Sequence, residues 1–235
     1  MKTGFVTVCE TTLPRHLPQC NTLAASLKEH SDFALHVYTY THEFSDDVDE
    51  VVRIQDFTDA PPRLNTTFNY NLKGIVTNHM FTNNDYDQIV FVDCDLVMTS
   101  PTKAFEEELS EGDIWGNYSK FDATHRLLQS GAKFDHIVEL LDISGDFFEA
   151  MYYFTETMLV INRSNATAKF LNNWARICEA VSATNINPCY ESVELGMALH
   201  QTKADLDLRQ LRTTSLKTDK TFLTDHRDKF IDVIS

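Results

Sequence analysis

Two aspartates stand one residue apart directly after an apolar run, because Asp93 and Asp95 follow Ile89-Val90-Phe91-Val92. In an extended strand, residues two positions apart face the same side, so the pattern predicts both carboxylates on one face at the strand's end, with Cys94 turned away. Two carboxylates held close together repel each other, and a hard divalent cation relieves that repulsion while phosphate oxygens and water complete its shell. The spacing therefore predicts a site for Mn²⁺ or Mg²⁺. The alternative is that the two aspartates cap backbone amides in a solvated turn.

The composition argues against several other kinds of chemistry. The chain has 20 basic and 35 acidic residues, a formal net charge of −15, which argues against nucleic acid as a partner because phosphate backbones are bound through clusters of lysine and arginine. The seven glycines form neither the glycine-rich dinucleotide fingerprint nor a P-loop. The Gly-x-Ser-x-Gly nucleophile elbow and the His-Glu-x-x-His zinc motif are also absent from the sequence.

Cysteine usage and hydropathy bear on the compartment. The five cysteines are widely spaced and include no Cys-x-x-Cys pair, which is typical of reduced, buried thiols. The N-terminal apolar stretch is too short for a signal peptide, and no segment approaches the roughly 18 apolar residues of a transmembrane helix. We therefore expect a cytoplasmic protein without an integral membrane segment.

Strand and helix signals alternate in the first half of the chain. Such alternation predicts an α/β fold of Rossmann-like type, a mostly parallel sheet with helices on both faces, in a single domain over residues 1–235. In this architecture ligands bind beyond the carboxyl ends of the strands, which is where Asp93 and Asp95 stand in the sequence. The predicted strands are 5–9, 33–40, 51–54, 89–92 and 113–117, and the predicted helices are 17–27, 72–80 and 101–109.

The second half has a looser pattern of apolar residues, and no repeat or linker divides it from the first. An aromatic-rich stretch at 147–154 precedes the next clear strand signal. The predicted helices are 122–130, 133–141, 170–178 and 191–199, and the predicted strands are 158–161 and, at a sheet edge, 206–211.

The Asp-x-Asp strand, the apolar segment after it and the helix that begins at Ser100-Pro101 together resemble a GT-A-fold nucleotide-sugar glycosyltransferase, with a layout most similar to glycosyltransferase family 8. The resemblance implies a hexosyl- or pentosyltransferase that moves a sugar from a nucleoside diphosphate sugar, with a UDP-sugar as the expected donor, to a hydroxyl acceptor such as a glycan. It implies that residues 1–117 bind the nucleotide sugar and residues 118–235 face the acceptor. In such enzymes the Asp-x-Asp holds Mn²⁺ or Mg²⁺ on the donor diphosphate, and the cation acts as a Lewis acid for the leaving group.

The same resemblance implies which residues bind the donor. The end of the first strand and the residue after the second would face the nucleotide base, and a lysine on the helix before the metal strand would reach the donor. A solvated helix lysine without a ligand is the alternative for Lys73. The residues that the resemblance assigns to donor binding are Val8, Cys9, Glu10, Thr11, Tyr40, Lys73, Asp93 and Cys94.

Three residues of the second half complete the implied site. Glu191 or Glu194 stands in a segment that resembles the family's Asp-Glu-x-x-Leu helix start, and would deprotonate the acceptor hydroxyl if the reaction inverts; the helix dipole alone also favours glutamate there. His226 matches a late histidine that serves as the third metal ligand beside Asp93 and Asp95, and an exposed histidine in a polar tail is its alternative. The chain lacks the family-8 C-terminal histidine motif with its Gly and Lys-Pro, and the Asn-Ser-Gly that usually precedes the later strand.

Other functions fit parts of the same pattern. Asp93 and Asp95 after an apolar strand also match the nucleophile motif of haloacid-dehalogenase-type phosphatases, although that motif usually follows the first strand and three predicted strands precede it here. A sugar-nucleotide-forming nucleotidyltransferase would open with a glycine-rich loop that the chain lacks. A non-enzymatic binding module is the remaining alternative.

Overall fold

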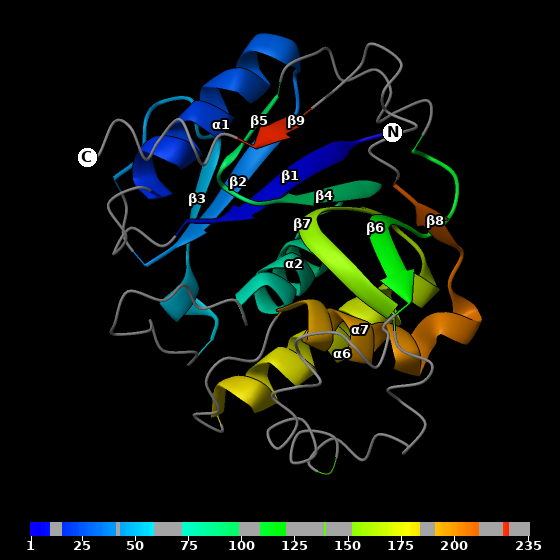
Figure 1. Ribbon diagram of the computed structural model, residues 1–235. Coiled ribbons are helices and arrows are strands. Elements are labelled where there is room, and N and C mark those ends of the chain that lie inside the picture. Colours follow the sequence, from blue (N-terminus) through cyan, green and yellow to red (C-terminus); the bar gives the residue numbers. More distant parts are fainter. Residues whose placement is uncertain are drawn as a thin grey trace.

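The computed structural model of the chain describes residues 1–9, 16–40, 43–58, 72–98, 109–120, 139, 152–183, 191–211 and 223–225. A seven-stranded sheet in the order β3-β2-β1-β4-β7-β6-β8 forms the centre, and β5 and β9 form a small second sheet (Figure 1). The strands are β1 (Thr3–Val8), β2 (Ala34–Thr39), β3 (Glu50–Arg53), β4 (Gln88–Val92), β5 (Leu96–Met98), β6 (Ile114–Lys120), β7 (Tyr152–Asn162), β8 (Leu208–Gln210) and β9 (Leu223–Asp225). The helices within these ranges are α1 (His16–His30), α2 (Leu72–Asn83), α6 (Asn165–Ala183) and α7 (Glu191–Thr202), with the short 3-10 helices η1 (Ile54–Asp56) and η3 (Lys203–Asp205).

Most strands of the large sheet run in one direction. β1 pairs in parallel with β2 and β4, β2 pairs in parallel with β3, and β6 pairs in parallel with β8. β7 is antiparallel to both of its neighbours, β4 and β6. The predicted mostly parallel α/β sheet is therefore confirmed, with β8 at an edge as expected. The antiparallel strand in its middle is not predicted by the sequence pattern.

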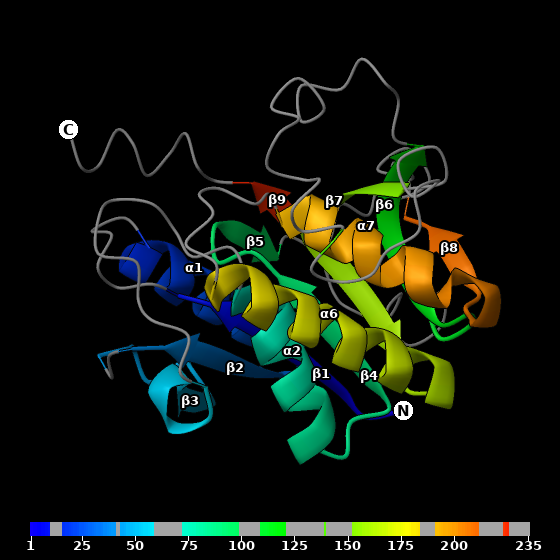
Figure 2. The same ribbon diagram turned by 90° about the horizontal axis from the view of Figure 1, so that it is seen from below.

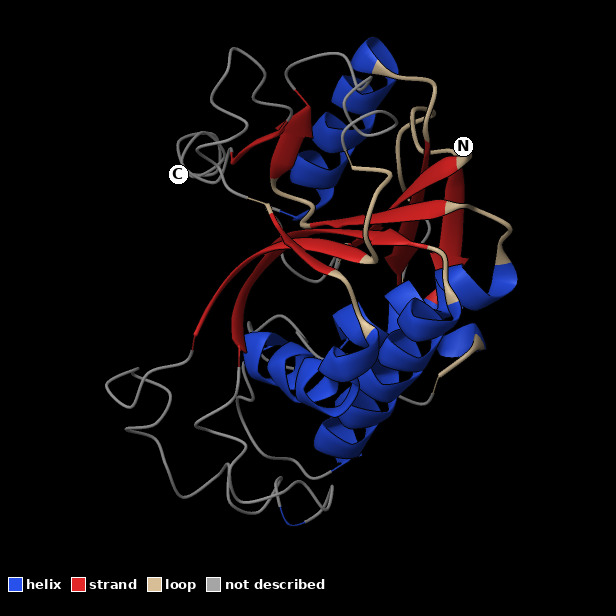
Figure 3. Cartoon of the chain, turned by 90° about the vertical axis from the view of Figure 1, so that its right-hand side faces the viewer, coloured by secondary structure: helices blue, strands red, loops and turns tan. Residues whose placement is uncertain are grey.

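Helices cover both faces of the sheet, as expected. α1 lies on one face together with the small β5–β9 sheet, and α2, α6 and α7 lie on the opposite face (Figures 2 and 3). The two-residue period of a strand divides β1 between the two cores: Phe5 and Cys9 belong to the core under α1, whereas Val6 and Val8 belong to the core under α2. β1 and β4 are buried on both faces, and neither strand contains a charged residue.

A glycine allows α2 and α6 to approach closely. A Cβ atom on Gly74 would lie 2.7 Å from Sγ of Cys178 and 2.9 Å from the ring of Trp174. Both neighbours belong to α6 and are fully buried. Gly74 therefore allows the first turn of α2 to rest tightly against α6, which fixes the position of that turn.

Two features of the sheets differ from the sequence-based expectation. β7 begins at Tyr152, so part of the aromatic stretch belongs to the same strand as 158–161. β5 and β9 pair with each other although they lie far apart in the chain, and local sequence patterns carry no signal for such pairing. The predicted helices at 101–109, 122–130 and 133–141 fall almost entirely outside the described residues.

The cysteines that the structure describes are buried thiols, in agreement with the sequence analysis; they are Cys9, Cys20, Cys94 and Cys178. Cys189 lies outside the described residues. Over the described ranges, no helix combines the length and the apolar character that are needed to cross a membrane.

Candidate functional site

The carboxyl ends of β1, β2 and β4 meet at one edge of the sheet, because these strands are parallel. The chain leaves β1 through α1 on one face and enters β4 from α2 on the other face. In α/β sheets, ligands bind at the strand ends where such connections diverge. Val6 pairs with Phe91, so Asp93, which directly follows β4, stands at this edge beside the end of β1.

β4 ends at Val92, and the Asp-x-Asp segment forms a turn. The backbone N–H of Leu96 donates to the carbonyl oxygen of Asp93 at 3.2 Å, and the chain then enters β5. The segment is therefore a turn and not a continuation of the extended strand, so the strand pleat does not set the directions of the two carboxylates. The Asp93 side chain is 23% exposed, and Oδ1 of Asp95 is buried.

Lys73 reaches Asp93 from the first turn of α2. Its Nζ lies 2.7 Å from Oδ1 of Asp93, and its side chain is only 3% exposed. The ammonium also lies 5.4 Å from the centroid of the Phe91 ring. The alternative of a solvated helix lysine is therefore wrong: Lys73 is a buried cation paired with the first aspartate of the motif, and such a charge is tolerated in the interior when it is paired.

The side chains of Val8, Cys9 and Cys94 are buried. Cys9 and Cys94 lie in the core under α1, as expected for a Cys94 turned away from the aspartates. Burial raises the pKa of the Cys94 thiol, and the neighbouring Cys9, Asp95 and Asp93 raise it further, so the thiol stays protonated at neutral pH. The backbone N–H of Cys9 donates to the carbonyl oxygen of Tyr38 at 2.9 Å, so the buried side chains of Val8 and Cys9 and this N–H all belong to the interior of the fold.

The base-binding candidates after β1 and β2 are described only in part. Glu10 and Thr11 lie outside the described residues, whereas Tyr40 is half-buried and packs against the core under α2.

An aromatic cluster formed by β2, α2 and the residue after η1 is absent from the sequence-based candidates. The hydroxyl of Tyr38 is hydrogen-bonded to Nδ1 of His79 at 2.9 Å, and the ring of Phe57 stacks on His79 at a centroid distance of 4.0 Å. Burial raises the pKa of Tyr38 and lowers the pKa of His79, so both groups stay neutral near pH 7. These residues come from three separate elements, so no local spacing in the sequence points to them.

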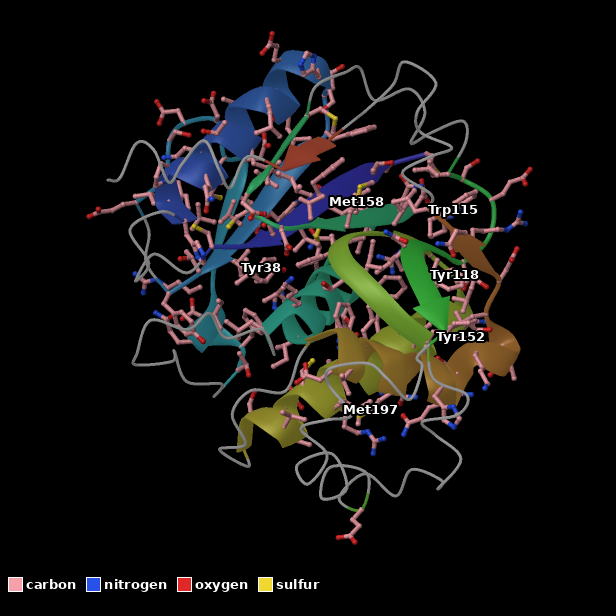
Figure 4. All side chains as sticks on the ribbon, viewed as in Figure 1. Tyr38, Trp115, Tyr118, Tyr152, Met158 and Met197 are labelled. Carbon is pink, nitrogen blue, oxygen red and sulfur yellow. The ribbon has the colours of Figure 1, made fainter. Side chains whose placement is uncertain are left out.

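β6 and β7 extend past the carboxyl end of β4. Met158 pairs with the last residue of β4, and β7 begins several residues earlier, at Tyr152. The pairing of β6 with β7 shifts register between Gly116 and Asn117, which marks a bulge where the extension begins. On it, the rings of Tyr118 and Tyr152 lie edge to face at 5.3 Å (Figure 4). The extension therefore starts next to the Asp-x-Asp turn.

The two glutamates of α7 have different surroundings. Glu194 is fully buried, and its Oε2 accepts a hydrogen bond from Sγ of Cys178 on α6 at 3.1 Å. A carboxylate enclosed between two helices is poorly placed to meet an acceptor hydroxyl. Glu191 is the first residue of α7, and its side chain is outside the description. The packing of Glu194 therefore argues against it as the base, and Glu191 remains the candidate.

The C-terminal part of the chain returns to the Asp-x-Asp turn. β9 pairs with β5 so that Asp225 is opposite Leu96, the residue after Asp95. His226 follows β9 directly and lies outside the described residues. Within the described part of the chain, no three His, Cys, Asp or Glu side chains gather into a group that could hold a metal ion. The neighbouring carboxylates fit Mn²⁺ or Mg²⁺ when substrate phosphate and water supply the other ligands.

Comparisons with known proteins found no relative of this chain. No family model matches the chain, and no curated protein is significantly similar to it.

Proposed function

We propose that the chain is a metal-dependent glycosyltransferase of GT-A type that transfers a sugar from a nucleoside diphosphate sugar, a UDP-sugar, to a hydroxyl acceptor such as a glycan. The observation that carries the proposal is the acidic turn of Asp93 and Asp95, at the strand end where the connections of the sheet diverge, with the buried Lys73 against it. Positively and negatively charged side chains therefore lie together at the edge of the sheet where α/β proteins bind nucleotides.

Each described group has a role in this proposal. Asp93 and Asp95 hold Mn²⁺ or Mg²⁺, which when bound supplies Lewis-acid chemistry at the diphosphate, and His226 is the proposed third ligand. Lys73 contributes a fixed positive charge beside the diphosphate. The resemblance assigns the nucleotide to the segment Val8, Cys9, Glu10 and Thr11 together with Tyr40, and the proposal keeps this assignment. The buried thiol of Cys94 anchors the turn to the core under α1.

The reaction forms one bond and breaks one. The acceptor oxygen bonds to the anomeric carbon of the sugar, and the bond from that carbon to the diphosphate oxygen breaks with its electron pair leaving on the nucleoside diphosphate. If the configuration inverts, the hydroxyl proton goes to the carboxylate of Glu191. The extension of β6 and β7, with Tyr118 and Tyr152, is the proposed acceptor side.

The phosphatase alternative predicts a different product. In that reaction Asp93 would attack phosphorus from a motif that usually follows the first strand, yet three parallel strands precede β4 in the chain. This position favours the glycosyltransferase. A product assay separates the two, since the phosphatase releases inorganic phosphate from a phosphomonoester and the transferase does not.

The test is a calorimetric binding panel of nucleotides and nucleotide sugars, each with and without Mn²⁺. We expect UDP and one UDP-sugar to bind only with the cation, and Asp95→Asn to weaken that binding about 100-fold or more, because a ligand to the cation is lost. Thermal unfolding of the variant checks that it folds, since Oδ1 of Asp95 is buried.

A matched control is Asp205→Asn. Asp205 also pairs with a lysine, Lys169 at 2.9 Å, but on the surface and away from the site. This variant should bind like the wild type. If no nucleotide binds to the wild type under either condition, or if Asp95→Asn binds unchanged, the proposed function is wrong, and phosphomonoester hydrolysis becomes the next assay.

A further inference from the structure

The pair of Lys73 and Asp93 is held firmly. Lys73 belongs to the first turn of α2, and the next residue, Gly74, is pressed against Trp174 and Cys178 with no room for a Cβ atom. The ammonium therefore cannot retreat with the helix. With its side chain 3% exposed, Lys73 also has little access to water, so its charge depends on the carboxylate 2.7 Å away.

The formal charges at the turn have a simple consequence. Lys73 carries one positive charge and the two aspartates carry two negative charges, so these three side chains leave one net negative charge. A divalent cation gains less from such a site than from two uncompensated carboxylates, and it is repelled by the fixed ammonium. A diphosphate adds negative charge and restores a strong attraction for the cation.

We infer that Lys73 is a built-in counter-cation: it engages Oδ1 of Asp93 and weakens divalent-cation binding to the empty site, so that the cation is held tightly only together with a diphosphate. This inference rests on the proposed function for the identity of the diphosphate as part of the donor. It makes Lys73 a positioning residue for Asp93 and assigns the stronger hold on the cation to Asp95, because Asp93 shares its Oδ1 with the ammonium of Lys73.

The inference predicts an order of Mn²⁺ affinities without any nucleotide. Lys73→Met, which replaces the buried charge by an apolar chain, should bind Mn²⁺ about tenfold more tightly than the wild type, because it removes a repulsion between a divalent ion and a unit charge that is worth roughly that factor across several ångströms even at the dielectric constant of water. Asp93→Asn keeps the ammonium and should bind Mn²⁺ about tenfold more weakly. The double variant removes both charges and should lie between the two single variants.

The measurement is titration of each protein with Mn²⁺ followed by the spin-resonance signal of the free ion, with thermal unfolding as the check on folding. A second series at saturating UDP gives the factor by which the nucleotide tightens Mn²⁺ binding, and this factor should be smaller in Lys73→Met than in the wild type. A merely structural pair would weaken Mn²⁺ binding in both single variants, and a lysine that touches only the donor would leave the nucleotide-free affinity unchanged.

The outcomes separate the two proposals. Equal or weaker Mn²⁺ binding by Lys73→Met, or no Mn²⁺ binding by any of the proteins, overturns the counter-cation role, even if the wild type releases UDP from a UDP-sugar. Tighter binding by Lys73→Met supports it, even if no nucleotide sugar proves to be a substrate. If Lys73→Met does not fold, the double variant is compared with Asp93→Asn. The counter-cation role then requires that the double variant binds Mn²⁺ more tightly than Asp93→Asn does.

Discussion

The two ends of β4 differ in chemistry. At its amino end, neutral amides bond to one another: Nε2 of Gln88 donates to Oδ1 of Asn162 at 2.9 Å, and Nδ2 of Asn162 donates to the carbonyl oxygens of Leu109 and Gly112, each at 2.9 Å. At its carboxyl end, the buried Lys73 of α2 pairs with Asp93, which is partly exposed in the turn after β4. Buried neutral groups with backbone partners stabilise a fold, whereas a charged pair at a strand end is a candidate for binding ligands.

Arg163, the residue after β7, also makes hydrogen bonds near the amino end of β4. Its Nη2 donates to the carbonyl oxygens of Phe81 and Asn84 at 2.8 and 2.7 Å, at the C-terminal end of α2. A cation at this end of a helix is favoured by the helix dipole. The same helix therefore has a basic group at each end: Lys73 pairs with Asp93, and Arg163 donates to carbonyl oxygens at the helix's C-terminal end. Substitutions at the two edges should consequently affect different properties.

The largest effect on stability is expected from a substitution at the amino edge of the sheet, the edge where the amino end of β4 lies. Asn162→Leu removes hydrogen bonds to Leu109, Gly112 and Gln88, and should lower the free energy of unfolding by about 3 kcal/mol, because buried polar partners are left unpaired. Urea unfolding measures this loss. Metal-dependent UDP binding by the folded variant should match the wild type.

The control for Asn162→Leu is Asn172→Leu at an exposed position of α6, which should change the free energy of unfolding by less than about 0.5 kcal/mol. Weaker UDP binding by Asn162→Leu in the folded state would mean that the two ends of β4 are not independent.

Two glycines sharpen the comparison with matched substitutions. A Cβ on Gly4, in β1, would lie 2.7 Å from the ring of Tyr86 at the amino edge, and a Cβ on Gly74 would lie 2.9 Å from the ring of Trp174 behind Lys73. Gly4→Ala and Gly74→Ala should each lower the free energy of unfolding by about 2 kcal/mol through overpacking. Only Gly74→Ala should also weaken UDP binding, since it displaces the first turn of helix α2, to which Lys73 belongs. Equal UDP affinities in calorimetric titrations of the two variants would show that Lys73 need not be held in place.

The smallest expected effect is a dependence of stability on pH at the amino edge. Burial lowers the pKa of His36, although Glu50 opposes this, and Nε2 of His36 is hydrogen-bonded to the Tyr86 hydroxyl at 2.8 Å. Below about pH 6.5 the unfolded chain binds a proton that the folded protein does not, so the free energy of unfolding falls until the pH reaches the pKa of folded His36. The loss is about 1.4 kcal/mol for each unit by which that pKa is lowered.

Urea unfolding at a series of pH values measures this dependence, and His36→Asn should give a less stable protein with a flatter profile. Parallel profiles for the variant and the wild type would assign the pH dependence to other groups, among them His79, whose pKa burial also lowers.

Much of the fold is predictable because local patterns determine it. The apolar runs of β1, β2 and β4 and the helical spacing in α1, α2 and α6 are visible in the sequence, and they are enough to predict a mostly parallel sheet with helices on both faces. The pairing of β5 with β9 and the antiparallel direction of β7 depend on contacts between distant segments, which single-sequence patterns do not contain.

The candidate site is predictable in its location but not in its geometry. The order of the elements predicts that Asp93 stands at the carboxyl end of a parallel strand, and the structure agrees, since Asp93 directly follows β4 beside the end of β1. The turn after Val92 is not predicted, because an apolar run does not show where a strand stops. The pair of Lys73 with Asp93 joins a helix to a strand end, so it follows only from the packing of α2.

The most direct test of the central claim is the release of UDP from UDP-sugars by the wild type, measured with Mn²⁺, with a chelator, and with Mn²⁺ restored. The account predicts release from at least one UDP-sugar with Mn²⁺, none with the chelator, recovery when the cation returns, and loss in Asp95→Asn but not in Asp205→Asn. Release that persists in the chelator, or that is unchanged in Asp95→Asn, would contradict the assignment of the carboxyl edge of β4 as the donor site.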